Sequence, residues 1–157
     1  MSNTLSEATE VAERQGWMAT LAKATPGELE ALWPAAVADT PAYRRLRGPE
    51  FGLAMVRGRV GGTGNPFNIG EMTVTRCAVQ LANGVIGHAY VGGRRPRQAE
   101  LAAVADALLQ DAPHRAALLE RLIAPLNAAA AERHRVTAGK AAATKVEFFT
   151  VAREAGG

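Results

Sequence analysis

The sequence has few of the residues that mark secreted, zinc-binding or nucleic-acid-binding proteins. Its 157 residues include a single cysteine, Cys77, which allows neither an internal disulfide nor a cysteine-based zinc site. Aromatic residues make up 5% of the chain and are not interleaved with the arginines as in a base-stacking surface. We therefore expect a protein of the cytoplasm that binds no nucleic acid.

Long apolar runs and clustered histidines are also missing. No run approaches the roughly 20 apolar residues that a membrane-spanning helix needs. The first ten residues lack the apolar stretch of a secretory signal. The histidines, His88, His114 and His134, stand far apart without the spacing of metal ligands. We expect no membrane association and no bound metal.

Alanine and a mild positive charge are what the sequence has in excess. The chain is 48% hydrophobic with a net charge of +3, and 33 of its residues are alanine. Alanine favours helix but removes little apolar area from water, so a thin core is predicted. The length suits one domain, residues 1–157, and the thin core suggests burial against partners.

The N-terminal third reads as a helical hairpin. Residues 6–23 predict a first helix with Met18 and Leu21 on one face. Thr25-Pro26-Gly27-Glu28 then has the pattern of a capping box with proline in the first turn. Pro34 and Pro41 interrupt the helical pattern after this box, so the second helix is predicted to be short.

The middle of the chain changes to a strand pattern. Residues 51–60, 71–81 and 85–91 predict three strands, and residues 43–47 are a weaker candidate for a fourth. Asn83-Gly84 predicts a two-residue hairpin turn. With helices on both sides of this segment, the sequence predicts an α+β fold with an antiparallel meander of three to four strands.

The predicted turn fixes a register. It places Leu81, Val79 and Cys77 opposite Ile86, His88 and Tyr90 on a bulky face, and it leaves small residues around Arg76 on the other face. Cys77 is then packed rather than nucleophilic. Farther along the strand, Met72 and Val74 fall on the Arg76 side. This indicates a bulge, or burial on both faces of a strand that is longer than its own domain needs.

The C-terminal third returns to helix. A helix is predicted from Pro96, a second opens at Pro113 and is ended by Pro125, and a third covers residues 127–144. Phe148 and Phe149 follow in a short apolar tail. We expect this tail to dock on a neighbouring subunit.

The glycine-rich loop from Gly61 to Gly64 is the first candidate site. Its backbone N–H groups could form an anion-binding nest, with Arg59 and Arg76 supplying charge from the flanking strands. The other interpretation, which spacing alone favours, is a strand connection that needs positive φ. Arg94 and Arg95 are predicted to lie near the point where this loop joins the strand at Glu71.

Several motifs in order resemble the PhnG family. They are Arg59-Val60-Gly61-Gly62-Thr63-Gly64-Asn65-Pro66-Phe67, Gly70-Glu71-Met72-Thr73-Val74-Thr75-Arg76, Leu122-Ile123-Ala124-Pro125-Leu126 and Lys145-Val146-Glu147-Phe148-Phe149-Thr150, and the similarity runs from about residue 14 to residue 153. That family is the G subunit of the carbon–phosphorus lyase core complex of bacterial phosphonate metabolism. The family pattern often has an aspartate and a histidine where this chain has Arg95 and Gln98, so no role of those groups is carried over.

The resemblance implies a subunit that is not active alone. Its partners would be the H, I and J subunits, with the I subunit most direct, and the K and L subunits functionally. The implied reaction is displacement of adenine from ATP by an alkylphosphonate, which gives a ribose 1-phosphonate 5-triphosphate. ATP is then a substrate of the complex, and no cofactor is expected on this chain.

We therefore assign no catalytic residue and no metal ligand. The candidates for ligand or partner contact are Arg59, Gly61, Gly62, Thr63, Gly64, Glu71, Thr75, Arg76 and Arg94, and those for partner docking are Phe148 and Phe149. The alternative hypothesis is an independent module that binds a phosphorylated small molecule through the Gly61–Gly64 loop.

Overall fold

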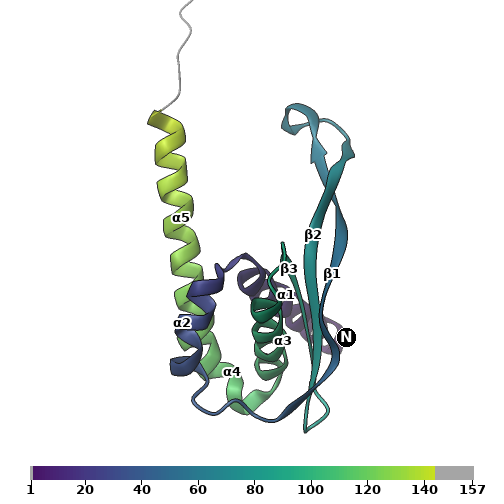
Figure 1. Ribbon diagram of the computed structural model, residues 1–157, viewed down its shortest axis with the longest axis vertical. Helices are drawn as coiled ribbons and strands as arrows, with labels where there is room; N and C mark the ends of the chain where they lie inside the picture. Colours follow the sequence, from purple (N-terminus) through teal and green to yellow (C-terminus); the bar gives the residue numbers. More distant parts are fainter. Residues whose placement is uncertain (1, 144–157) are drawn as a thin grey trace, which may run out of the picture.

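The computed structural model describes residues 2–143 and has the predicted α+β architecture (Figure 1). Its three strands form one antiparallel sheet in the order β1-β2-β3, which confirms the meander. No helix among the described residues is long and apolar enough to cross a membrane. The elements are α1 (Ser2–Lys23), α2 (Pro26–Ala36), β1 (Tyr43–Arg59), β2 (Pro66–Leu81), β3 (Ile86–Gly92), α3 (Pro96–Gln110), α4 (Ala112–Leu118), a π-helical turn (Leu119–Ile123) and α5 (Ala124–Ala143).

The two N-terminal helices are confirmed, but they pack on other elements rather than on each other as a hairpin: α1 lies mainly against α3 and β3, and α2 against α3 and the π-helical turn. Thr25 caps α2 in a full capping box: its hydroxyl accepts from the backbone N–H of Glu28, and its own N–H donates to the Glu28 carboxylate at 3.0 Å. Burial of Trp17, Leu21 and Leu29 then packs both helices into the core.

The first two strands are longer than the sequence pattern predicted. Residues 43–47 and 51–59 are not separate strands but one strand, β1, whose pairing with β2 shifts twice between Arg45 and Glu50. These bulges let Gly48 and Pro49 sit inside the strand without ending it. β2 begins at Pro66 rather than at Glu71. The hairpin is therefore longer than expected, because β1 is continuous from Tyr43 to Arg59 and β2 starts five residues earlier.

The predicted register of the second hairpin is wrong by one residue. Gln80, not Leu81, pairs with Ile86. The Leu81 N–H donates to Val85 O at 2.9 Å, so the loop has three residues, and Gly84 takes the left-handed conformation with φ +88°. This is the three-residue turn with a glycine bulge rather than the two-residue turn that Asn-Gly favours.

The shifted register exchanges the faces of β3. Gly87, Ala89 and Val91 now share the inner face, the side that α3 covers, with Cys77 and Val79. A Cβ on Gly87 would lie 2.0 Å from the backbone oxygen of Ala103, so α3 approaches the sheet closely there. The other side, the outer face, carries Arg76 beside the exposed Ile86, His88 and Tyr90.

Helix α3 forms the centre of the molecule, with every residue from Gln98 to Leu109 buried. Two polar groups tie it to α1. Asp106 accepts from Arg14 (2.7 Å), from Trp17 Nε1 (2.9 Å) and from the His88 backbone N–H (2.9 Å). Gln98 donates to backbone oxygens near the end of α1, the closer one at 2.7 Å. Gln98 is thus a structural residue here.

The prediction that Pro125 ends a helix is wrong. Pro125 lies in the first turn of α5, and α5 then runs to Ala143 (Figure 1). A π-helical turn, Leu119–Ile123, comes directly before it. A wide turn and a first-turn position both suit a ring that lacks an N–H donor, because the hydrogen bond that proline would break is not required there. Phe148 and Phe149 lie outside the described residues.

Candidate partner-docking surface

The distal half of the β1–β2 hairpin projects from the body of the molecule (Figure 1). We call residues 51–73 the arm. β3 pairs with β2 only between residues 74 and 80, so beyond the Gly52–Val74 pair the arm has no third strand. Among the side chains that the structure describes, none from residue 38 to residue 74 is buried. At about 3.3 Å per residue, the nine residues of β1 in the arm extend roughly 30 Å.

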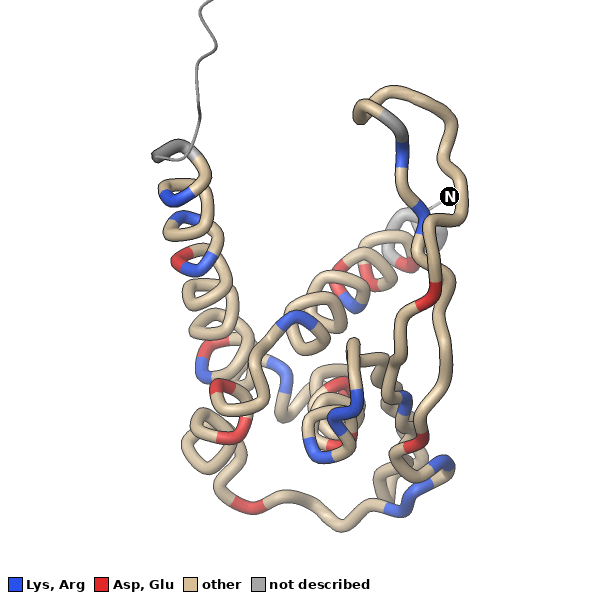
Figure 2. The backbone as a smooth tube through the Cα atoms, turned by 45° about the horizontal axis from the view of Figure 1, so that its top comes forward, with Lys and Arg blue, Asp and Glu red and all other residues tan. Residues whose placement is uncertain are grey.

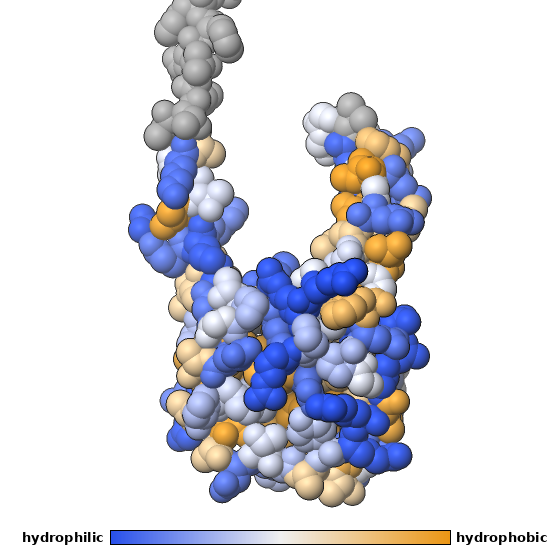
Figure 3. All heavy atoms as spheres, in the orientation of Figure 1, coloured by the Kyte–Doolittle hydropathy of each residue, from blue (hydrophilic) through white to orange (hydrophobic). Residues whose placement is uncertain are grey.

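Large apolar side chains are exposed along the arm. Their exposed fractions run from 44% for Met72 to 68% for Leu53. In Figure 3, apolar side chains gather on the arm, whereas the opposite prong, α5, is mainly polar. Half of the large apolar residues that are exposed in the described part of the chain lie here: Phe51, Leu53, Met55, Phe67, Ile69 and Met72.

Pairing across the ribbon shows which face these residues occupy. Phe51 lies opposite Thr75, Leu53 opposite Thr73 and Met55 opposite Glu71. Paired residues of antiparallel strands share a face, and Thr75 is buried on the inner face. The three apolar residues of β1 therefore continue the inner face beyond α3. Met72 points to the outer face, where it lies against Gly92.

The glycine loop is the tip of the arm. Gly61 and Gly62 have φ of 61° and 79°, which is the positive-φ strand connection that spacing favoured. Arg59 donates through Nη1 to Gly64 O at 3.0 Å, and Thr63 is exposed. Arg76 does not join them. It lies ten residues along β2 from the end of the loop at Pro66, which corresponds to roughly 30 Å.

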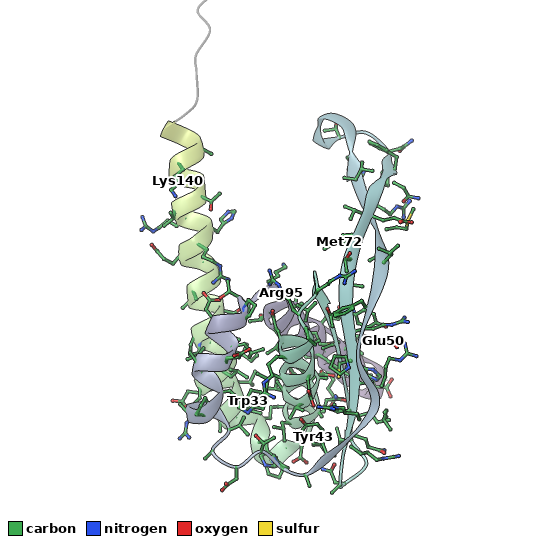
Figure 4. All side chains as sticks on the ribbon, viewed as in Figure 1. Trp33, Tyr43, Glu50, Met72, Arg95 and Lys140 are labelled. Atoms are coloured by element: carbon green, nitrogen blue, oxygen red, sulfur yellow. The ribbon has the colours of Figure 1, made fainter. Side chains whose placement is uncertain are left out.

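Arg94 and Arg95 lie at the base of the arm, not at its loop. The Gly93 N–H donates to Thr73 O at 2.7 Å, so this turn is level with the middle of β2. The expected closeness to the loop is wrong because β2 extends five residues past Glu71. Arg94 lies over the Phe51 ring at 5.1 Å, and Figure 4 shows Arg95 at the top of the body.

Thr75 holds that turn in place. It is fully buried, its hydroxyl donates to Gly93 O at 2.6 Å, and it accepts from the Arg95 N–H at 2.9 Å. α3 starts directly after this turn without a side-chain cap. Thr75 therefore acts as a positioning residue for the exposed arginines rather than as a contact residue itself.

Arg76 belongs to a charged group on the outer face. Its Nε lies 2.6 Å from Glu50 Oε1 and is buried without a hydrogen bond, and Arg47 donates to the same oxygen at 2.9 Å. Figure 4 shows Glu50 on the side of the sheet away from the helices. The group borders a shallow pocket lined by Leu46, Arg47, Arg76, Cys77, Ala78, His88 and Tyr90.

An ion pair between the exposed Arg45 and the buried Glu100, near the lower end of β1, was missed in the sequence. Glu100 accepts two bonds from Arg45, at 2.8 and 3.0 Å, and one from Tyr43 at 2.8 Å. Burial acts to raise the pKa of Glu100, but the hydrogen bonds from Arg45 and Tyr43 outweigh it and hold the pKa below its usual value. Its position on the buried face of α3, toward β1, could have been found from helical periodicity.

The described residues offer little for catalysis. Burial, with the Glu100 charge nearby, raises the pKa of Cys77 to about 11, so its thiol is not ionised near neutral pH. Within residues 2–143 no group of three His, Cys, Asp or Glu side chains could hold a metal ion. The two buried carboxylates are engaged in structural ion pairs. Together these features define a small α+β protein whose conspicuous surface feature is an exposed apolar ribbon.

Comparison with known proteins gives the particular family. Residues 12–154 match the family described as phosphonate metabolism protein PhnG, and the chain belongs to that family. It is 48% identical over 146 residues to the alpha-D-ribose 1-methylphosphonate 5-triphosphate synthase subunit PhnG of Rhizobium meliloti (strain 1021). The match covers 91% of this chain and 90% of the relative. The resemblance inferred from the motifs is confirmed.

Proposed function

We propose that this chain is the G subunit of a synthase that makes a ribose 1-alkylphosphonate 5-triphosphate. The observation that carries the proposal is the 48% identity to such a subunit over nearly the full length of both chains. The product is ATP with its adenine replaced by a phosphonate. A phosphonate oxygen therefore forms a bond to C1′ of the ribose, the C1′–N9 bond breaks, and adenine leaves with its electron pair and takes up a proton.

The chain acts in this reaction as a non-autonomous subunit. Its described residues place no general acid beside a nucleophile, and the one thiol is held protonated. The reacting groups thus come from other subunits of the carbon–phosphorus lyase core complex. We place the I subunit in most direct contact with this chain, with H and J in the same assembly and K and L linked functionally. ATP is a substrate of this cytoplasmic complex, and no cofactor is proposed on this chain.

The contact residues proposed from the sequence fall at three levels of the arm. Arg59, Thr63 and the loop glycines Gly61, Gly62 and Gly64 form its tip, Glu71 lies in its middle, and Arg76 and Arg94 lie near its base. Contact with a partner suits this arrangement better than a phosphate cradle, because the arginines are spread along the ribbon instead of converging on one point.

Reconstitution of the complex tests the proposal. The H, I, J and L subunits encoded in the same genome are co-expressed with and without this chain, and adenine release from ATP plus methylphosphonate is followed by chromatography. We expect turnover only when the chain is present, and none from the chain alone. Equal turnover without the chain, or adenine release by the isolated chain, would overturn the proposal.

Calorimetry separates this function from independent ligand binding. The alternative module would bind ATP or methylphosphonate by itself through the tip loop, with a dissociation constant on the order of micromolar. We expect no heat of binding from the isolated chain at that level. Binding that is lost in Arg59→Ala would favour the alternative, since Arg59 is the charged group in contact with the loop.

A further inference from the structure

We infer that the arm inserts into an apolar, acid-rimmed groove of another subunit, and that this insertion holds the chain in its complex. The inference rests on the proposed function and goes beyond it by naming the docking element and the chemistry of its receptor. Three observations support it: the exposed apolar residues, the unprotected edge of β1, and the sign of the charge along the arm.

The arm is poorly suited to solvent on its own. An isolated two-stranded ribbon is marginally stable in water, and exposed apolar patches of this kind mark binding sites on protein surfaces. Phe51, Leu53 and Met55 form a row on one face, and Met72 lies on the other. Met72 already lies against Gly92, so the receptor has to cover the apolar row together with the open edge of β1 beside it, which a groove does and a flat surface does not.

The free edge of β1 is protected toward both ends of the strand and open between Phe51 and Val56, since a third shift of register follows Val56 and two arginines lie beyond it. Below Glu50, the strand carries three arginines, a proline and two shifts of register, all of which hinder pairing with another strand: Arg44, Arg45, Arg47, Pro49 and the bulges on either side of Arg47. From Phe51 to Val56 the pairing with β2 is regular and no residue is charged. The open backbone groups of this segment can accept a strand of the receptor.

The charge of the arm selects the receptor. Arg57 and Arg59 lie near the tip, Arg94 and Arg95 at the base, and Glu71 is the one acidic residue from 51 to 73. Figure 2 shows basic positions near the tip of the arm and an acidic position farther down the ribbon. Two copies of the arm would bring tip against tip in a parallel pairing, or tip against base in an antiparallel one. Both place arginines against arginines, so a different chain with acidic side chains is favoured over self-association.

Assembly can be tested with variants that change the arm but not the core. In one variant, Leu53→Asp and Met55→Asp place two carboxylates in the apolar row. In a second, residues 54–72 are replaced by Asn-Gly, which joins the paired residues Leu53 and Thr73. The matched control is Val11→Asp on α1, because Val11 is exposed to the same extent as Met55 (56% and 57%). Circular dichroism and thermal unfolding confirm that each variant is folded.

Each tagged variant is co-expressed with the H, I, J and L subunits, and their recovery and the adenine release are measured. We expect both arm variants to recover the partners at least about tenfold less than the wild type, and Val11→Asp to match it within about twofold. Recovery by the arm variants equal to the control would overturn the inference, as would arm-dependent dimers of the isolated chain in sedimentation.

The same experiment distinguishes the two proposals. If the wild-type chain fails to restore adenine release, the proposed function is wrong whatever the arm does. If the wild type and the shortened variant both restore it and recover the partners equally, the function stands and the arm inference is wrong. A double variant, Arg57→Glu with Arg59→Glu, tests whether the receptor is acidic. It should recover fewer partner subunits than the wild type, and this difference should be larger at low salt than at high salt because salt screens the charges.

Discussion

Replacing Gly87 by alanine is the most direct test of how α3 packs on the sheet. An added Cβ would lie 2.0 Å from Ala103 O, 2.6 Å from Ala107 N and 2.8 Å from Ala107 Cβ. Two of these three atoms belong to the backbone of α3, which cannot rotate away as a flexible side chain would. The whole helix, or the strand beneath it, must therefore move.

The size of the effect follows from that displacement. An ordinary contact distance is about 3.4 Å, so the sheet and helix must separate by more than 1 Å locally. Overpacking a core commonly costs about 1–3 kcal/mol, and a shift of a helix that is buried over twelve residues belongs at the upper end, near 3 kcal/mol. For a chain of this length, that corresponds to a melting temperature lower by roughly 6–12 °C.

Thermal and urea unfolding, followed by circular dichroism, measure this cost. Gly52→Ala is the matched control: it lies in β1 with nothing within 4 Å of its Cβ position, so we expect its stability to equal or slightly exceed that of the wild type. Combining Gly87→Ala with Ala107→Gly should not restore stability, because the two closest atoms are backbone atoms. A Gly87→Ala melting temperature within about 2 °C of the wild type would refute the packing.

Three further predictions concern the buried polar groups. Asp106→Asn removes the carboxylate that accepts hydrogen bonds from Arg14 and Trp17, and should lower the free energy of unfolding, measured in urea, by roughly 2–3 kcal/mol. The control is Glu132→Gln, which breaks an exposed ion pair and should leave the urea midpoint unchanged. Cys77 has a pKa of about 11, so at pH 8 it should react with a disulfide reagent at least roughly a hundredfold more slowly in the native protein than in denaturant. Equally fast labelling of the native protein would contradict the burial of this thiol. The folded pKa of Glu100 is lowered, so its charge stabilises the fold above the unfolded value of 4.5, and this contribution is lost as the pH falls through the folded pKa. Glu100→Gln should therefore flatten the acid side of a profile of melting temperature against pH, and an unchanged profile would contradict the linkage.

The features that could be predicted from the sequence are those set by local chemistry. The capping box at Thr25 and Glu28 determines where α2 begins, and it is made by residues three apart in the chain. The positive φ of Gly61 and Gly62 is likewise a property of a short turn. These predictions needed no knowledge of the elements that pack against the segment.

The register of the second hairpin could not be predicted from the turn alone. Asn83-Gly84 suits two turn types that differ by one residue, and a shift of one residue turns every side chain of β3 to the other face. The helix that packs on the sheet decides between them. With Gly87 inward, α3 can approach the strand, whereas with Ile86 and His88 inward it could not lie as close.

The strands of the arm could be predicted from the sequence, but their projection from the body could not. The alternation of Phe51, Leu53 and Met55 predicts a strand with one apolar face, and periodicity does not say what covers that face. Only the length of β3 decides this. β3 ends opposite Val74, which pairs with Gly52, so Leu53 and Met55 lie beyond the last paired residue of β3. The sequence does contain one indication that β2 is longer than its own domain needs. At Met72 and Val74 the apolar residues move to the face of the strand that carries Arg76.

The thin, alanine-rich core is then explained without a partner. Alanines of α3 face a strand whose inner residues include Gly87 and Ala89, and small residues on both sides are what allow the helix and the sheet to approach so closely. Within the described residues, the body buries its own core, and the unburied apolar residues are concentrated on the arm instead. The need for a partner thus follows from where the apolar side chains are and not from how few large ones the core has. Among these residues the arm contacts the body only near its base, for example through Met72 and Phe51, so most of it can be removed without touching the core, which is why shortening the arm should weaken assembly and leave the fold intact.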